Sequence, residues 1–182
     1  MRIIGGTYRG KKLITPPNAA IRPTTDRMRE TLFNMLEHGA GPGIRGSRIL
    51  DLFAGTGALG IEALSRNAEH VTFVDYDRSS MQLVKNNTAL IGNPDNTSYI
   101  TLDGTKITAS QAYDIILIDP PYNKGLILLA LQNILERSLL SEGGVIVIEY
   151  SSSEEMEIPS QFSEIKKKKM GEATFSILEL TL

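Results

Sequence analysis

The chain has 182 residues, of which 41% are hydrophobic and 22% charged, a composition typical of one globular domain of ordinary size. The absence of cysteine excludes disulfides, thiolate metal sites and a cysteine nucleophile, and two histidines are too few for an imidazole metal cage, so we expect no metal. The start lacks the long apolar core of a signal peptide, and the most apolar stretch, residues 126–135, is interrupted by Gln132 and Asn133. These features favour a cytoplasmic protein that does not enter a membrane.

The net charge of −2 is unevenly distributed along the chain. Residues 1–48 carry nine Lys and Arg against three acids, a balance of +6, so the remainder carries −8. A basic arm on an acidic body indicates contact with a polyanion, because each phosphate contact releases counterions. Chance clustering on a solvated surface is the alternative interpretation.

Glycine and proline punctuate the first part of the chain. Residues 1–14 alternate weakly around three glycines and predict a short hairpin or extended arm. After a proline-marked loop, an amphipathic helix is expected, with Thr25 as its cap and Gly39 at its end. We therefore divide the chain into an arm, 1–23, and a core domain, 24–182, made of a helix (24–38), a linker (39–47) and a sheet region (48–182).

From residue 48 onward, apolar runs typical of strands alternate with helical patterns. Residues 115–118 (IILI) and 145–148 (VIVI) are apolar at every position, as strands covered on both faces require. Further strands are expected at 49–53, 71–74 and 99–102, helices at 58–65, 78–91 and 127–140, and a closing antiparallel hairpin at 162–169 and 174–182. The sequence thus predicts an α/β fold, a mostly parallel open sheet with helices on both faces.

A glycine-rich turn, DLFAGTGALG, spans Asp51 to Gly60 where the first core strand meets its helix. In such sheets ligands bind at the carboxyl ends of the strands, and glycines such as Gly55 and Gly57 let the backbone approach them closely. The turn also satisfies the dinucleotide pattern GxGxxG, with Asp75 as a ribose partner. Taken alone, it leaves open an NAD-dependent oxidoreductase and a purely structural turn.

Three acids follow or end three consecutive predicted strands: Asp51, Asp75 and Asp103. A carboxylate at Asp51 repels a pyrophosphate but attracts the ammonium of a methionine moiety, which favours S-adenosylmethionine as cofactor. On this interpretation Asp75 accepts hydrogen bonds from both ribose hydroxyls and Asp103 from the adenine amino group. Each acid could instead be a helix cap.

The tetrapeptide Asp119-Pro120-Pro121-Tyr122 follows the fourth buried strand. The proline pair removes two backbone donors and predicts a rigid turn at the sheet edge. If Asp119 and the Pro120 carbonyl accept hydrogen bonds from a nucleobase amine, its nitrogen lone pair is aligned for methyl transfer, and Tyr122 stacks on the base. A proline turn with a capping Asp and a core Tyr is the structural alternative.

The segments RPTTDRMRETLFN (22–34), DLFAGTGALGIEALSR (51–66) and DPPY together closely resemble the RsmD family of ribosomal RNA methyltransferases. The resemblance implies a Rossmann-like class I methyltransferase fold with seven strands. It also implies methylation of the 2-amino group of one guanine, nucleotide 966, in 16S rRNA, either naked or within a small-subunit assembly intermediate. It maps the cofactor-facing positions onto Asp51, Gly55, Gly57, Asp75 and Asp103, and the catalytic turn onto Asp119 to Tyr122. Asp103 stands where some relatives have Asn, which would still accept from adenine.

The basic N-terminal segment also gains a role from this resemblance. Arg29 is expected to pair with the carboxylate of the cofactor, and the target guanine to be splayed out of its RNA stack. The lysines at 166–169 either add to the RNA contacts or protect an edge strand from pairing. Candidate phosphate contacts are Arg2, Arg9, Lys11, Lys12 and Arg22.

Several alternatives remain open at this point. The same turn would suit an amino-methyltransferase acting on adenine in DNA or on glutamine in protein, and a non-catalytic RNA-binding module with a degenerate pocket is a further class. We expect a monomer.

Overall fold

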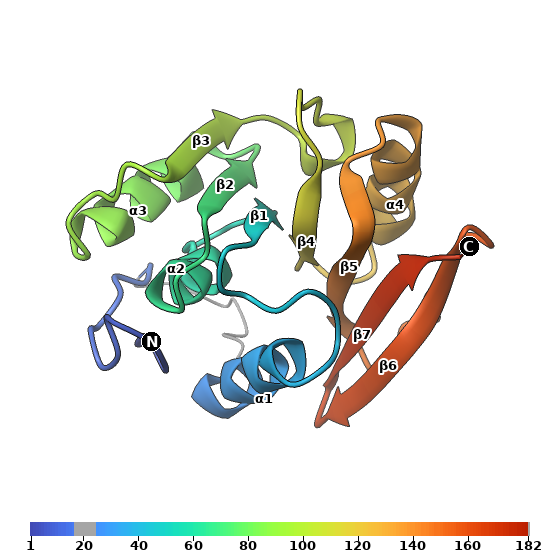
Figure 1. Ribbon diagram of the computed structural model, residues 1–182, viewed down its shortest axis with the longest axis horizontal. Helices are drawn as coiled ribbons and strands as arrows, with labels where there is room; N and C mark the ends of the chain where they lie inside the picture. The colour runs from blue at the N-terminus through green and yellow to red at the C-terminus, as the bar shows by residue number, and fades with distance from the viewer. Residues whose placement is uncertain (17–24, 182) are drawn as a thin grey trace.

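The computed structural model describes residues 1–16 and 25–181 and is built around one seven-stranded sheet (Figure 1). The strand order is β3-β2-β1-β4-β5-β7-β6. The first five strands in this order are parallel, whereas β7 runs antiparallel to both β5 and β6. The predicted mostly parallel sheet with a closing antiparallel hairpin is therefore confirmed. The strands are β1 (Arg48–Leu52), β2 (His70–Asp75), β3 (Thr97–Thr101), β4 (Tyr113–Ile118), β5 (Leu140–Ser151), β6 (Phe162–Met170) and β7 (Ala173–Leu180).

Helices cover both faces of the sheet, as the alternation of strands and helices predicts. Odd-numbered strand residues such as Ile49 and Leu117 pack against α1, α2 and α3 on one face, which we call the odd face. Even-numbered residues such as Leu50 and Ile118 pack against α4 on the other, the even face. The helices are α1 (Asp26–Glu37), α2 (Ala58–Ser65), α3 (Arg78–Ala89) and α4 (Leu126–Glu136), with a 3-10 turn, η1 (Gly104–Lys106).

The boundary between α4 and β5 differs from the sequence expectation. The helix expected at 127–140 ends at Glu136, and Leu140 already belongs to β5, where it pairs with Tyr113 of β4. Ser138 adopts a left-handed φ of 50°, which an α-helix does not accommodate. The expected helix at 78–91 likewise ends at Ala89, so both helices were predicted too long.

The N-terminal segment forms an extended antiparallel arm with a single bridge between Arg2 and Lys12. Its apolar residues Ile3 and Leu13 are buried in the core of the odd face. The buried carboxylate of Glu62 in α2 holds the arm in place by accepting from the backbone N–H groups of Ile4 (2.7 Å) and Gly5 (2.8 Å). The arm is thus part of the core packing. Within residues 1–16 and 25–181, no helix has the length and apolar character needed to span a membrane.

Candidate active site

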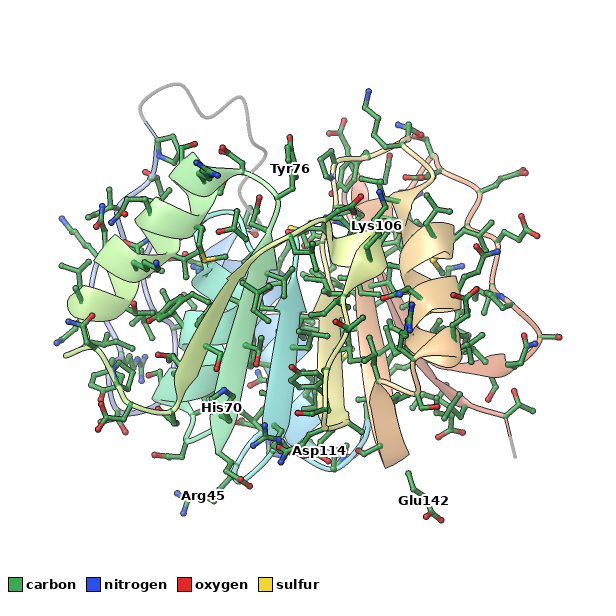
Figure 2. The ribbon with its side chains drawn as sticks, turned by 90° about the horizontal axis from the view of Figure 1, so that it is seen from above. Arg45, His70, Tyr76, Lys106, Asp114 and Glu142 are labelled. Atoms are coloured by element: carbon green, nitrogen blue, oxygen red, sulfur yellow. The ribbon has the colours of Figure 1, made fainter. Side chains whose placement is uncertain are left out.

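The predicted acidic residues gather at the carboxyl edge of the parallel strands. Asp51 lies in β1, Asp75 ends β2, Asp103 follows β3 and Asp119 follows β4. Figure 2 shows Tyr76 and Lys106 at this edge, with His70 and Asp114 at the opposite one. Because β1 lies between β2 and β4, Asp51 stands at the centre of the group.

The glycine turn depends on its glycines for both conformation and space. Gly55 and Gly57 have positive φ values of 55° and 77°. The N–H of Gly60 donates to Asp51 Oδ2 at 2.9 Å, and a Cβ on Gly60 would lie 2.3 Å from the Phe73 ring. The turn and Asp51 therefore fix each other's positions. Phe53 within the turn has a φ of 62°, an unusual conformation for a bulky residue that the sequence did not signal.

Asp75 connects the glycine turn to the start of α3. Its Oδ2 accepts from the Gly55 N–H and its Oδ1 from the Asp77 N–H, both at 2.9 Å. Asn87 of α3 adds a second connection, since its amide donates to the Thr56 carbonyl (2.9 Å) and its Oδ1 accepts from Ile14 in the arm (2.7 Å). Arm, turn and α3 thus form one hydrogen-bonded unit.

Asp103 caps η1, the alternative that the sequence had left open for each acid. Its Oδ1 accepts from the backbone N–H (2.9 Å) and the hydroxyl (2.8 Å) of Thr105. These hydrogen bonds, followed by the charge of Lys106, lower the pKa of Asp103. Its Oδ2 lies 3.6 Å from the Lys106 ammonium, and because the side chain remains 41% exposed, this oxygen keeps a lone pair that can accept from a ligand.

The centre of the edge holds three carboxyl groups on the odd face, which we call the acidic cluster: Asp51, Asp119 and Glu149. Burial raises the pKa of Asp51 to about 8, although the hydrogen bond from the Gly60 N–H lowers it in part, and the charge of Asp75 adds the smallest contribution, a further increase. Burial, then Glu149, then Asp51, raise the pKa of Asp119 well above its usual range. Among the described residues, neither Asp51 nor Asp119 forms an ion pair. The cluster is therefore suited to a positively charged ligand.

Sequence reasoning missed Glu149. It lies in β5, is 4% exposed and accepts a hydrogen bond from the Tyr122 hydroxyl at 3.1 Å. The only signal was an acid directly after the apolar run VIVI, which resembles the position of Asp119 after IILI. The catalytic turn predicted at 119–122 is thus tied to the adjacent strand. Tyr76, which is 72% exposed beside Asp75, is a second missed candidate.

The structure places the predicted basic residues in three different situations. The buried Arg29 donates through Nη2 to Asp26 Oδ1 and to the Arg2 carbonyl, both at 2.7 Å. Its Nε and Nη1 have no hydrogen-bond partner among the described residues. Arg2 pairs with Asp26 at 2.8 Å, and Lys11 Nζ donates to the Leu90 carbonyl at 2.8 Å. Arg9 and Lys12 are exposed, and Arg22 lies outside the described residues.

Among residues 1–16 and 25–181, no group of three or more His, Asp or Glu side chains is placed to hold a metal ion.

The strand order, the glycine turn and the acids at the strand ends together define the fold of a class I methyltransferase. More particularly, the chain belongs to the family described as conserved hypothetical protein 95, whose model matches residues 1–179. It is 35% identical to "Ribosomal RNA small subunit methyltransferase D" of Escherichia coli over 98% of this chain and 89% of that protein. The protein of the same name from Haemophilus influenzae is also 35% identical, over 98% and 93%. These relatives confirm the predicted resemblance to the RsmD family.

Solved structures agree with this assignment. The Escherichia coli protein yhhF superimposes with a TM-score of 0.86 and 33% identity, covering 99% of this chain and 97% of its own. The fold alone is shared with SMU.776, solved in complex with SAH, at a TM-score of 0.63 and 18% identity over 82% of this chain and 48% of that one.

Proposed function

We propose that the protein is an enzyme that transfers a methyl group from S-adenosylmethionine to the exocyclic 2-amino group of a guanine in 16S rRNA, of the nucleotide 966 type. The observation that carries this proposal is the acidic cluster beside the glycine turn. The relatives named for small-subunit rRNA methylation support the choice of substrate.

The chemistry of the cluster fits the proposed cofactor. When bound, S-adenosylmethionine supplies a methyl group on a positively charged sulfur, together with an ammonium group and no phosphate. Asp51 favours such cations, because a nearby positive charge stabilises a carboxylate that burial otherwise keeps protonated. The pyrophosphate of NAD would gain no such stabilisation at this point, and an ionised Asp51 would repel it.

The remaining cofactor contacts follow from groups with unused hydrogen-bonding capacity. Each Asp75 oxygen accepts one backbone N–H and retains a lone pair for a ribose hydroxyl. Asp103 Oδ2 faces the adenine amino group in the same scheme, and Gly55 and Gly57 allow the backbone to approach the ligand. The two unpartnered nitrogens of Arg29 suit a carboxylate, since buried guanidinium groups without partners are destabilising.

Asp119 and Pro120 act on the substrate amine. The Asp119 carboxylate and the Pro120 carbonyl accept its two N–H groups, which frees the nitrogen lone pair from conjugation with the ring. Positive charge that develops on nitrogen is stabilised by Asp119 and its acidic neighbours. Because the pKa of Asp119 is raised, the same carboxylate can take the proton that the methylated nitrogen loses.

In this proposal two aromatic side chains bind bases. Tyr122 is anchored through its hydroxyl to Glu149, which limits the orientations of its ring before the guanine arrives. A stacking contact of this kind contributes about 1–3 kcal/mol per base. The exposed ring of Tyr76 beside Asp75 offers a second flat surface at the same edge.

The proposed partner is 16S rRNA or a small-subunit assembly intermediate, bound by a monomer. Arg2, Arg9, Lys11 and Lys12 on the arm, with Arg22, supply phosphate contacts, and the guanine is flipped out of its stack into the site.

The test is transfer of tritiated methyl from S-adenosylmethionine to four acceptors: naked 16S rRNA, small-subunit particles from a strain lacking the enzyme, DNA, and protein. The proposal predicts radioactivity only in the rRNA or the particles. Radioactivity in DNA or protein would assign the chemistry to another acceptor. A parallel titration in which NAD binds and S-adenosylmethionine does not would exclude a methyltransferase altogether.

A further inference from the structure

The edge strand β6 carries four consecutive lysines, Lys166 to Lys169, and all four are exposed. Alternate residues of a strand point to opposite faces, so this run presents two lysines on each face of the sheet. The two pairs therefore have different surroundings.

Strand register assigns each pair to a face. Residues directly opposite each other in an antiparallel pair share a face. Lys168 is opposite Phe175 and Lys166 is opposite Ile177, and both partners belong to the core of the odd face. Phe175 is in turn opposite Glu149 on β5. Lys166 and Lys168 therefore lie on the same face as the acidic cluster.

The position along the strand also matches the site. Lys168 lies level with Glu149, with only β7 between their strands. The backbones of β5 and β6 are two strand spacings apart, which corresponds to about 10 Å. An RNA whose target base reaches Asp119 thus brings its neighbouring phosphates toward these lysines. Neither Lys166 nor Lys168 forms an ion pair within residues 1–16 and 25–181.

The other two lysines face an acidic region. Lys167 and Lys169 are opposite Ser176 and Thr174, and the Lys167 ammonium lies 3.8 Å from Glu164 and 5.7 Å from the centre of the Tyr150 ring. Tyr150 belongs to the core of the even face. The loop that supplies Glu154, Glu155 and Glu157 packs on this face through Met156 and Ile158. A polyanion is repelled here.

We propose that Lys166 and Lys168 bind phosphates of the RNA substrate that flank the methylated nucleotide, whereas Lys167 and Lys169 do not. This inference rests on the proposed function. It places RNA contacts on both sides of the acidic cluster, because the arm packs against α2 and α3 while β6 forms the opposite end of the sheet (Figure 1).

The experiment compares two double variants of the full chain that each remove two charges from β6: Lys166→Gln with Lys168→Gln, and Lys167→Gln with Lys169→Gln. Transcribed 16S rRNA serves as the probe, and affinity is measured against salt concentration together with kcat, KM and cofactor affinity. The first variant should raise KM about tenfold and reduce the salt slope by about 1.4–1.8, the value for two phosphates. Its kcat at saturating RNA and its cofactor affinity should not change. The second variant should change KM less than about twofold.

Equal effects of the two variants would show that the RNA responds to the total positive charge of β6 and not to two particular lysines, and would overturn the inference. The absence of any effect of the first variant would also overturn it. If self-association were the only change in that variant, the lysines would protect a sheet edge and the inference would again be wrong. If the wild-type protein transfers no methyl group to RNA, the proposed function itself fails; if it does and the two variants behave alike, only the lysine contacts are wrong.

Discussion

Asp119 combines two properties at the tip of β4: a raised pKa and a place next to Asp51 and Glu149. Replacing it with alanine should reduce methyl transfer at least about 10³-fold, because alignment, charge stabilisation and proton acceptance are removed together. Cofactor affinity should stay within a few-fold, which equilibrium titration measures. A large loss of cofactor binding would place Asp119 in the cofactor site instead.

Asp51 makes the stability of the ligand-free protein depend on pH. Its pKa lies at about 8 in the folded protein against an ordinary value of 3.8, so the folded state binds a proton that the unfolded state has released. The contribution of this group to the free energy of unfolding is complete below pH 3.8. It is lost as the pH rises from there to about 8, by up to about 1.4 kcal/mol per pH unit. The raised pKa of Asp119 acts in the same direction.

The variant Asp51→Asn should flatten this dependence between pH 5 and 8, since the amide oxygen can still accept from Gly60 without titrating. Urea unfolding at several pH values measures it. The variant should also bind S-adenosylmethionine more weakly than the wild type, most clearly near pH 8, where the wild-type carboxylate is ionised. An unchanged pH slope would mean that Asp51 is not the titrating group.

At single positions, sequence patterns predicted the acids that end strands but not the contacts between strands. Asp75 and Asp119 each follow an apolar run, and Asp51 lies near the end of one, so their place at the edge could be inferred. Glu149 also follows such a run, but its hydrogen bond to Tyr122 depends on β5 lying beside β4, a long-range fact. The left-handed φ of Phe53 has no sequence signature, because glycine usually occupies that conformation.

Among the elements, the arm is the one whose role the structure changes most. The sequence predicted its extended form and its charges, whereas its attachment to α2 through Glu62 required knowledge of packing. The ends of α3 and α4 could not be predicted from local patterns either, because apolar residues continue past both helices. The start of β5 depends on the pairing of Leu140 with Tyr113, which is a long-range contact.

The exposed cations of the arm should carry a share of RNA affinity. Neutralising Arg9, Lys11 and Lys12 together should reduce the salt slope of RNA binding by about 2–3, or about 0.7–0.9 for each phosphate that is no longer neutralised. Cofactor affinity should not change. Arg45→Ala removes an exposed charge at the opposite edge of the sheet (Figure 2) and serves as the control. If the triple variant kept the wild-type slope, the arm would have another role.

For the whole molecule, the uneven charge seen in the sequence becomes a spatial arrangement. A nearly neutral chain presents an acidic cluster at the sheet edge, a basic arm packed on α2 and α3, and the lysines of β6 at the far end (Figure 1). The mostly parallel sheet with helices on both faces was predictable from the alternation of strands and helices. The division of charge between the two faces was not, since it requires the register of β6 on β7.

The proposed role of the acidic cluster is to direct a methyl group onto a guanine amine. Mass spectrometry tests this role on nucleosides from 16S rRNA that has been incubated with the protein and S-adenosylmethionine carrying a deuterated methyl group. We expect the label in N2-methylguanosine alone, and none with the Asp119→Ala variant. Label in methyladenosine, or undiminished labelling by that variant, would show that the cluster does not have this role.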